Sequence, residues 1–186
     1  MKAKWTLQNV ILLALIAIIF SVVYWIMDPV YQLVSAALTP VGLQVFTTEL
    51  TLGVWMMAGP LAAYLLKKPG AGFIGEMLGA AGEMFLGGVY GVGTLLSGFV
   101  QGIASELGFT LVGYKNWTAG LWLSTLTGTI VTFAWSIIKD GYLHYNFGLL
   151  IALFVVRYLS IFFFGGVLVK GITTLLDRSK LLAKKD

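Results

Sequence analysis

The chain has 186 residues, of which 59% are hydrophobic and 11% are charged. Soluble domains are about 25% charged, so this composition indicates a protein built for the lipid bilayer, with no room for a separate soluble domain. The lack of cysteine excludes disulfide bridges, thiol catalysis and cysteine metal sites, and a net charge of +4 in so apolar a chain is not a nucleic-acid signal. We expect one all-α transmembrane domain over residues 1–186.

Runs of apolar residues predict six transmembrane helices. The first run is longer than the core of a cleavable signal peptide, so we expect it to remain in the protein as a helix. The predicted spans, in chain order, are Leu7–Met27, Val45–Leu66, Phe73–Leu86, a fourth that ends at about Val112, Trp117–Ile138 and Phe147–Val169. We expect the charged tail after the sixth span to lie along the cytoplasmic surface.

Prolines modify the predicted helices at two places. Asp28-Pro29 is typical of an N-cap followed by the first residue of a helix, so we expect a short separate helix that reaches Leu38, ends before Pro40 and forms a lid or re-entrant piece on the outer face. Pro60 lies inside the second predicted span and predicts a kink there.

The basic residues predict the orientation in the membrane. With six crossings and both termini in the cytoplasm, ten of the twelve Lys and Arg residues lie on the cytoplasmic side. Lys139 is the exception outside, and Arg157 lies within a span. Cytoplasmic loops of membrane proteins are enriched in Lys and Arg, so this distribution favours cytoplasmic termini in a multi-pass plasma-membrane protein.

The segment from Pro69 to Tyr114 has 46 residues with no Lys, Arg or His, although it carries Glu76, Glu83 and Glu106. A carboxylate at the centre of a membrane helix costs about 2.5–3.5 kcal/mol on insertion scales. Each of these groups therefore needs a basic partner from elsewhere in the bundle, a proton, or a cationic ligand. Thirteen of the 23 glycines lie in the same segment and predict close helix packing.

Two interpretations of these carboxylates remain open. In one, Glu76 or Glu106 pairs with Arg157, and Glu49 is an exposed charge at a helix start. In the other, buried carboxylates, an amide and aromatic rings bind a cationic ligand near the outer face. The candidate ligand contacts are Glu49, Trp55, Glu83, Tyr90, Gln101, Glu106, Trp135, Tyr145 and Asn146.

Between residues 49 and 117, a series of short motifs in the same order resembles the YkoE family. The series consists of Leu52-Gly53-Val54-Trp55, Ala58-Gly59-Pro60-Leu61-Ala62, Lys68-Pro69-Gly70-Ala71, Glu76, Glu83, Leu86-Gly87, Tyr90-Gly91, Ser97-Gly98, Val100-Gln101-Gly102, Ser105-Glu106, and Gly113-Tyr114 with Trp117. Outside this region the likeness is mainly one of hydropathy.

The resemblance implies a substrate-binding (S) component of an energy-coupling factor (ECF) ABC transporter, with six helices and a pocket near the outer face. Its implied ligand is thiamine or the hydroxymethylpyrimidine part of thiamine, and it implies no cofactor. Its implied partners are a transmembrane coupling (T) protein and two cytoplasmic ATPases. Small residues of the first helix (Ala14, Ala17 and Ser21) would form the face that docks on the coupling protein.

Two other functions compete with this one. A self-sufficient proton-coupled carrier would use the carboxylates as a proton relay, and a structural scaffold would use them only to pair with Arg157. The sequence contains no phosphate-binding loop for ATP hydrolysis and no hydrolase motif, so we do not expect an enzyme.

Overall fold

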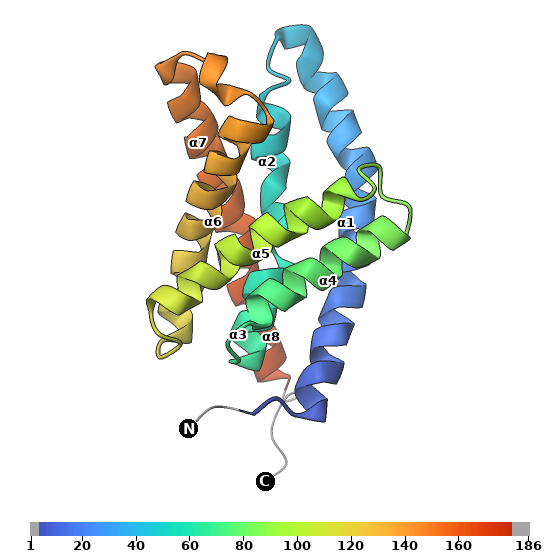
Figure 1. The fold of residues 1–186 in the computed structure, drawn as a ribbon, viewed down its shortest axis with the longest axis vertical. Coiled ribbons are helices and arrows are strands. Elements are labelled where there is room, and N and C mark those ends of the chain that lie inside the picture. The colour runs from blue at the N-terminus through green and yellow to red at the C-terminus, as the bar shows by residue number, and fades with distance from the viewer. Residues whose placement is uncertain (1–3, 180–186) are drawn as a thin grey trace.

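A computed structural model describes residues 4–179, and within them every regular element is a helix (Figure 1). The main helices are α1 (Leu7–Leu38), α2 (Phe46–Trp55), α3 (Ala58–Leu66), α4 (Ala71–Phe85), α5 (Gly93–Leu111), α6 (Trp117–Lys139), α7 (Phe147–Ile161) and α8 (Val169–Arg178). α2 runs into α3, and α7 runs into α8 through a π-helical stretch at Phe162–Leu168. These pairs each form one segment, so the predicted bundle of six helices is confirmed.

α1 is longer than predicted and contains Pro29 in its interior. The prediction of a separate short helix or re-entrant piece after Asp28 is therefore wrong. A proline inside a helix removes one backbone donor and crowds the preceding turn. Contacts with other segments hold the helix together here: the buried Asp28 accepts a hydrogen bond from the Val89 amide at 2.9 Å, and the Tyr31 ring packs against Trp55 at a centroid distance of 6.2 Å.

The second span is interrupted at Met56 and Met57, before Pro60, rather than kinked at the proline. Pro60 is the third residue of α3, where a helix has no internal partner for the backbone N–H, so its missing donor costs nothing. The free N–H groups of this first turn find partners on other helices. Ala58 donates to the Tyr24 hydroxyl at 3.1 Å, and Gly59 donates to the Glu76 carboxylate.

The last segment continues beyond the predicted end at Val169. α8 extends it to Arg178, and the rest of the charged tail lies outside the described residues. The Lys170 ammonium lies over the Tyr64 ring, 4.5 Å from its centroid, and so joins α8 to α3.

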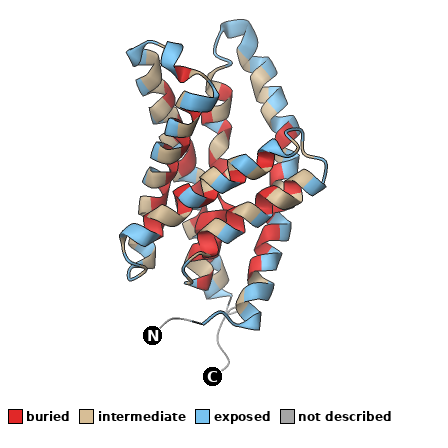
Figure 2. Ribbon diagram, in the orientation of Figure 1, coloured by how far each residue is buried: buried red, intermediate tan, exposed pale blue. Residues whose placement is uncertain are grey.

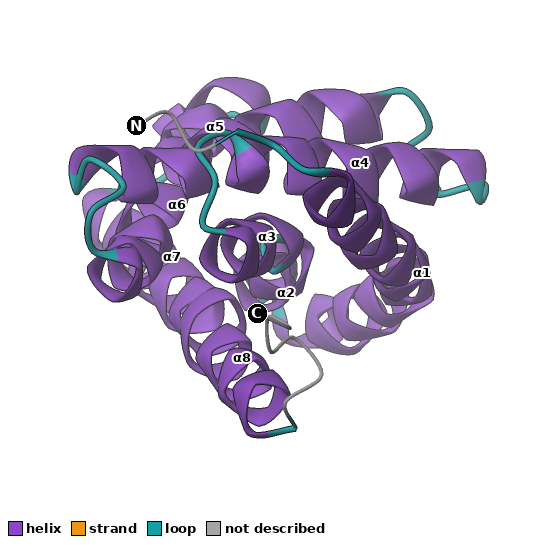
Figure 3. Ribbon diagram, turned by 90° about the horizontal axis from the view of Figure 1, so that it is seen from below, coloured by secondary structure: helices purple, strands orange, loops and turns teal. Residues whose placement is uncertain are grey.

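α4 and α5 lean across one side of the bundle and pack on each other and on α1 and α6 (Figures 1 and 3). Glycines permit this close approach, as predicted. A Cβ atom added to Gly75 would lie 2.7 Å from the Ala62 side chain, and one added to Gly102 would lie 2.9 Å from Phe73. A Cβ atom on Gly82 would collide with the Ser21 side chain of α1.

The same α1–α4 contact corrects one prediction. Ala17 and Ser21 are buried, and the Ser21 hydroxyl donates to the Ala17 and Gly79 carbonyls at 2.7 and 3.2 Å. These two residues therefore face α4 inside the protein and do not form an exposed docking face. Ala14 is exposed.

Exposed residues lie along the outside of every helix in the bundle (Figure 2), and many of them are large and hydrophobic. Phe85, Ile138 and Phe147 are each more than three-quarters exposed, at 82%, 77% and 77%. Within the described chain, four helical segments are long and apolar enough to cross a bilayer: Leu7–Val41, Phe46–Leu66, Trp117–Lys139 and Phe147–Arg178. Lipid chains are the environment in which such a surface is stable.

Candidate functional site

A cavity of about 370 Å³ lies between α1, α2, α4, α5, α6 and the loop after α4. Its size falls within the usual range of small-molecule sites, roughly 300–1,000 Å³. The lining residues Tyr31 and Lys139 lie near the C-terminal ends of α1 and α6, far from the start of α1 and the end of α8 (Figure 1). The cavity therefore opens in the half of the bundle opposite the start of α1 and the end of α8.

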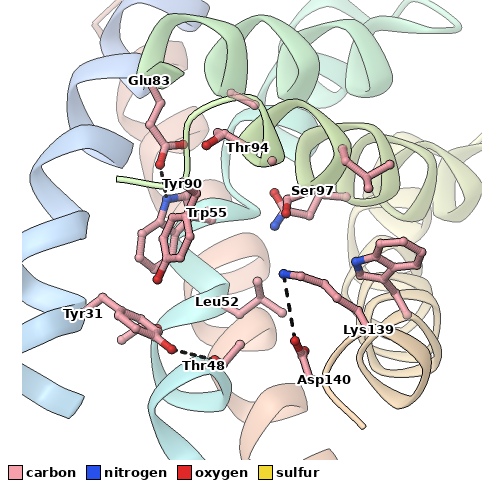
Figure 4. Close-up of a pocket in the computed structure, with 16 residues that line it drawn as sticks. Tyr31, Thr48, Leu52, Trp55, Glu83, Tyr90, Thr94, Ser97, Lys139 and Asp140 are labelled. Atoms are coloured by element: carbon pink, nitrogen blue, oxygen red, sulfur yellow. Dashed lines mark hydrogen bonds and ion pairs between the residues drawn. The ribbon is translucent and has the colours of Figure 1, made fainter. Parts of the chain in front are cut away.

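One end of the cavity is acidic. Glu83 of α4 is only 2% exposed, and its carboxylate accepts a hydrogen bond from the Trp55 indole N–H at 3.4 Å (Figure 4). Asp28 of α1 accepts a hydrogen bond from the Val89 amide and so fixes the loop after α4. Among residues 4–179, Glu83 forms no ion pair. This end of the cavity thus holds a buried carboxylate without a protein cation.

Three aromatic rings surround the acidic end. The Tyr31 ring meets the rings of Trp55 and Tyr90 edge to face, both at a centroid distance of 6.2 Å. The Tyr31 and Thr48 hydroxyls lie 3.2 Å apart (Figure 4). Burial and the neighbouring Tyr31 raise the pKa of the Tyr90 phenol, so this hydroxyl stays neutral and able to donate. Aromatic faces beside a carboxylate form a site that attracts an organic cation.

The other end of the cavity is polar and contains one positive and one negative side chain, Lys139 and Asp140. Ser97 and Gln101 of α5 and Trp135 of α6 line it. Lys139 reaches into it from the end of α6, toward the side where Ser97 lies (Figure 4). The Lys139 ammonium lies 4.0 Å from the Asp140 carboxylate. Because the two charges offset each other, this end offers hydrogen-bonding groups with little net charge.

Five of the nine predicted contact residues line this cavity together: Trp55, Glu83, Tyr90, Gln101 and Trp135. Whether each one touches a ligand stays a prediction. Sequence reasoning did not propose the lining residues Tyr31, Thr48, Thr94, Ser97, Lys139 and Asp140. Asp28-Pro29 could have drawn attention to Tyr31, since an acidic residue inside an apolar run needs a polar partner nearby.

Glu49 lies outside the cavity, in a buried ion pair with Arg157. Its two oxygens accept hydrogen bonds from Arg157 Nε at 2.5 Å and Nη2 at 2.9 Å, and from the Tyr142 hydroxyl at 2.6 Å. Both side chains of the ion pair are fully buried. Burial and the nearby Glu49 raise the pKa of the Tyr142 phenol, so it remains a donor.

The prediction that Arg157 pairs with Glu76 or Glu106 is therefore wrong. α2 and α7 are neighbours in the bundle, and this places Glu49 beside Arg157. Glu76 instead accepts hydrogen bonds from the Tyr24 hydroxyl at 2.8 Å and from the Gly59 amide. Glu49 is also not the exposed helix-start charge that one interpretation expected.

Glu106 lies outside the cavity as well, at the opposite end of α4. Its carboxylate accepts hydrogen bonds from the amides of Gly70, Gly72 and Phe73 at 2.6, 2.9 and 3.2 Å, and from the Tyr114 hydroxyl at 2.7 Å. A carboxylate at this position satisfies the free N–H groups of a helix N-terminus and its positive dipole end. Glu106 thus joins α5 to the start of α4.

The last two predicted contacts, Tyr145 and Asn146, lie in the loop before α7. The Tyr145 ring packs on Tyr142 at a centroid distance of 5.4 Å, and the Asn146 side chain accepts a hydrogen bond from the Leu149 amide at 2.9 Å. Asn146 is the N-cap of α7. Neither residue lines the cavity.

Comparisons with known proteins agree with this fold. Residues 8–134, more than half of the chain, match the family described as "ABC-type cobalt transport system, permease component". A Bacillus subtilis (strain 168) protein, provisionally named an HMP/thiamine permease protein, YkoE, is 27% identical over 171 residues, which cover 91% of this chain and 83% of that protein. A crystal structure of an S component of an ECF transporter superposes with a TM-score of 0.87 at 26% identity, covering 96% of this chain and 89% of that one.

The fold and the cavity therefore define an S component of an ECF transporter, which is a multi-pass plasma-membrane protein and not an enzyme. The chain belongs to the ABC-type cobalt transport system permease family, and within it the protein is an S component of the YkoE type, as the resemblance implied.

Proposed function

We propose that this S component captures thiamine, or its hydroxymethylpyrimidine part, in the cavity between Glu83 and Gln101. The observation that carries the proposal is the buried Glu83 carboxylate, which has no ion-pair partner among residues 4–179 and lies beside the rings of Trp55, Tyr31 and Tyr90. A buried carboxylate is costly unless a cation accompanies it. The relative named as an HMP/thiamine permease supports the choice of cation.

The chemistry of thiamine matches the two ends of the cavity. Its thiazolium ring is a permanent, flat cation, which suits the carboxylate and the aromatic rings at the Glu83 end. Its aminopyrimidine ring has hydrogen-bond donors and acceptors along one edge, and the Gln101 amide can both donate and accept. Free thiamine fits this lining better than its phosphates do, since the acidic end repels added negative charge.

We further propose that the cavity faces the outside of the cell. Lys67 and Lys68 follow α3, and the Lys68 ammonium donates to the Lys4 carbonyl at 2.8 Å, so Lys4 before α1 and the lysines after α3 lie together. The residues that line the cavity include Tyr31 and Lys139, toward the opposite ends of α1 and α6. The bias of Lys and Arg toward the cytoplasm supports cytoplasmic termini and an outward cavity.

Uptake through this subunit needs energy from partner proteins. The S-component fold supports partnership with a transmembrane coupling protein and two cytoplasmic ATPases, because the chain itself has no phosphate-binding loop. The competing carrier function has less support: Glu76 and Glu106 are engaged in hydrogen bonds that join helices and do not form a chain across the bundle. The scaffold function leaves Glu83 without a role, since Arg157 pairs with Glu49.

A thiamine titration of the purified protein in detergent tests the proposal, with tryptophan fluorescence as the signal because Trp55 and Trp135 line the cavity. We expect saturable quenching at sub-micromolar thiamine. A folded, ligand-free protein that shows no response to thiamine or hydroxymethylpyrimidine would contradict the proposal. Transport of thiamine by the purified chain alone in liposomes would instead favour the carrier.

A further inference from the structure

Two residues beside the polar end of the cavity carry buried hydrogen-bond donors without partners. Across the described chain, five buried side-chain atoms have no hydrogen-bond partner: Asp28 Oδ1, Thr94 Oγ1, Ser105 Oγ, Trp135 Nε1 and Arg157 Nη1. The Trp135 and Arg157 groups can only donate. Leaving such a group buried without a partner costs about 1–3 kcal/mol, so a pair of them beside a cavity requires an explanation.

Arg157 is held so that one of its groups remains unused. Its Nε and Nη2 are bound to Glu49, and Nη2 also donates to the Ser136 hydroxyl at 2.9 Å. The Phe133 ring lies against the guanidinium, 5.1 Å from Cζ to the ring centroid. The side chain has no freedom to turn Nη1 toward another protein acceptor, because its other nitrogens and one face are already fixed.

Arg157 and Trp135 both line a side cavity of about 60 Å³. The side cavity adjoins the main cavity, since the two share lining residues, among them Thr48, Leu52, Ser97, Gln101 and Trp135. One water needs roughly 10–15 Å³ by the same kind of measure, so the side cavity has room for a larger polar group. A ligand in the main cavity can thus extend one edge into the side cavity.

The charges around the side cavity indicate which group fits there. Arg157 is neutralised by Glu49, and Lys139 by Asp140. The two residues that carry the donors therefore line a region of little net charge. A hydrogen-bond acceptor is stabilised in such a region, whereas a phosphate dianion would find no cation that is not already paired. An uncharged acceptor, such as a ring nitrogen or a hydroxyl oxygen, satisfies the donors at the lowest desolvation cost.

We propose that the side cavity is a second subsite, in which Arg157 Nη1 and Trp135 Nε1 donate to an uncharged acceptor on the part of the ligand remote from its cation. This inference rests on the proposed function and deepens it. In thiamine the acceptor is a nitrogen of the pyrimidine ring, because the thiazolium occupies the Glu83 end. The Glu49–Arg157 pair then has a positioning role in recognition as well as a structural one.

The first test changes only the ligand and uses the wild-type protein in detergent micelles. Calorimetric titrations compare thiamine with the analogue in which C–H replaces both pyrimidine ring nitrogens, and with thiamine monophosphate. We expect the analogue to bind about ten-fold or more weakly, because the donors stay unpaired. Equal affinity for the analogue overturns the subsite, and tighter binding of the monophosphate overturns its uncharged character. No binding of thiamine at all refutes the proposed function, and the subsite with it.

The second test assigns the donors. Arg157→Lys removes the guanidinium fork, and Trp135→Phe removes the indole N–H while keeping a ring. We expect each variant to bind thiamine more weakly and to lose much of the discrimination against the ring-nitrogen analogue. Trp122→Phe is the matched control, since Trp122 packs on Phe162 and does not line either cavity. If Arg157→Lys does not fold, Trp135→Phe decides: unchanged discrimination in that variant overturns the assignment.

Discussion

Glu49 and Arg157 lie 108 positions apart in the sequence and form a fully buried, two-pronged ion pair that joins α2 to α7. Tyr142 donates a further hydrogen bond to Glu49, and Ser136 accepts one from Arg157. The pair explains how an arginine and a glutamate are tolerated inside the bundle, because each neutralises the other and satisfies most of its polar atoms. Because Arg157 pairs with Glu49, it does not pair with Glu83, and Glu83 lines the cavity instead.

Breaking this pair destabilises the protein. We expect Glu49→Gln to lower the free energy of unfolding by about 3–5 kcal/mol, because Arg157 is left as an uncompensated buried charge. Thermal unfolding in detergent, followed by circular dichroism, measures the effect. The double variant Glu49→Leu/Arg157→Met is the control, and it recovers much of the loss because it buries no charge. A single variant as stable as wild type would show that the pair does not stabilise the bundle.

Glu83 and Glu106 allow the same substitution to test two different roles. We expect Glu83→Gln to weaken thiamine binding about ten-fold or more with little change in stability, since it removes the charge that faces the cation. We expect Glu106→Gln to leave the affinity unchanged and to lower stability by about 1–3 kcal/mol, since the amides at the start of α4 lose their charged acceptor. Titration calorimetry and thermal unfolding of both variants measure the contrast, and a loss of affinity in Glu106→Gln would return that residue to the binding site.

Tyr31 was found by the structure alone and offers a further test of the aromatic site. We expect Tyr31→Ala to weaken thiamine binding several-fold, because the ring supports Trp55 and Tyr90 beside the cation. Tyr145→Ala is the matched control, since that ring packs on Tyr142 outside the cavity. The fluorescence titration measures both. Weaker binding in Tyr145→Ala than in Tyr31→Ala would place the site nearer to the loop before α7.

The contact between α1 and α4 depends on Gly82. Its added Cβ would occupy the space of the Ser21 side chain, so we expect Gly82→Ala to destabilise the protein by about 1–3 kcal/mol. Gly171→Ala in α8 is the control, because nothing lies within 4 Å of its Cβ position and alanine favours helix there. Thermal unfolding compares the two variants, and equal stability of both would show that α1 can move away from α4 without cost.

Much of the fold could be predicted because bilayer physics leaves few choices. A span must be an apolar helix of a certain length, so hydropathy located the segments at Val45–Leu66 and Trp117–Ile138 to within a few residues. The glycines concentrated between Pro69 and Tyr114 predicted close helix contacts for the same kind of reason, since only small residues let two backbones approach, and Gly75 and Gly102 make such contacts. Pro29 was misread because tertiary contacts at Asp28 and Tyr31 outweighed a local helix signal.

The sequence by itself determined the class of protein, its helices, and the fact that buried carboxylates needed partners. Only the tertiary structure decided which partner each one has: Arg157 for Glu49, helix-terminal amides for Glu76 and Glu106, and an open cavity for Glu83. Periodicity shows which face of a helix a residue occupies, but not which other helix meets that face. In a membrane most helix surfaces are equally apolar, so the order of helices depends on packing and on a few buried polar contacts that span 17 to 108 residues of sequence.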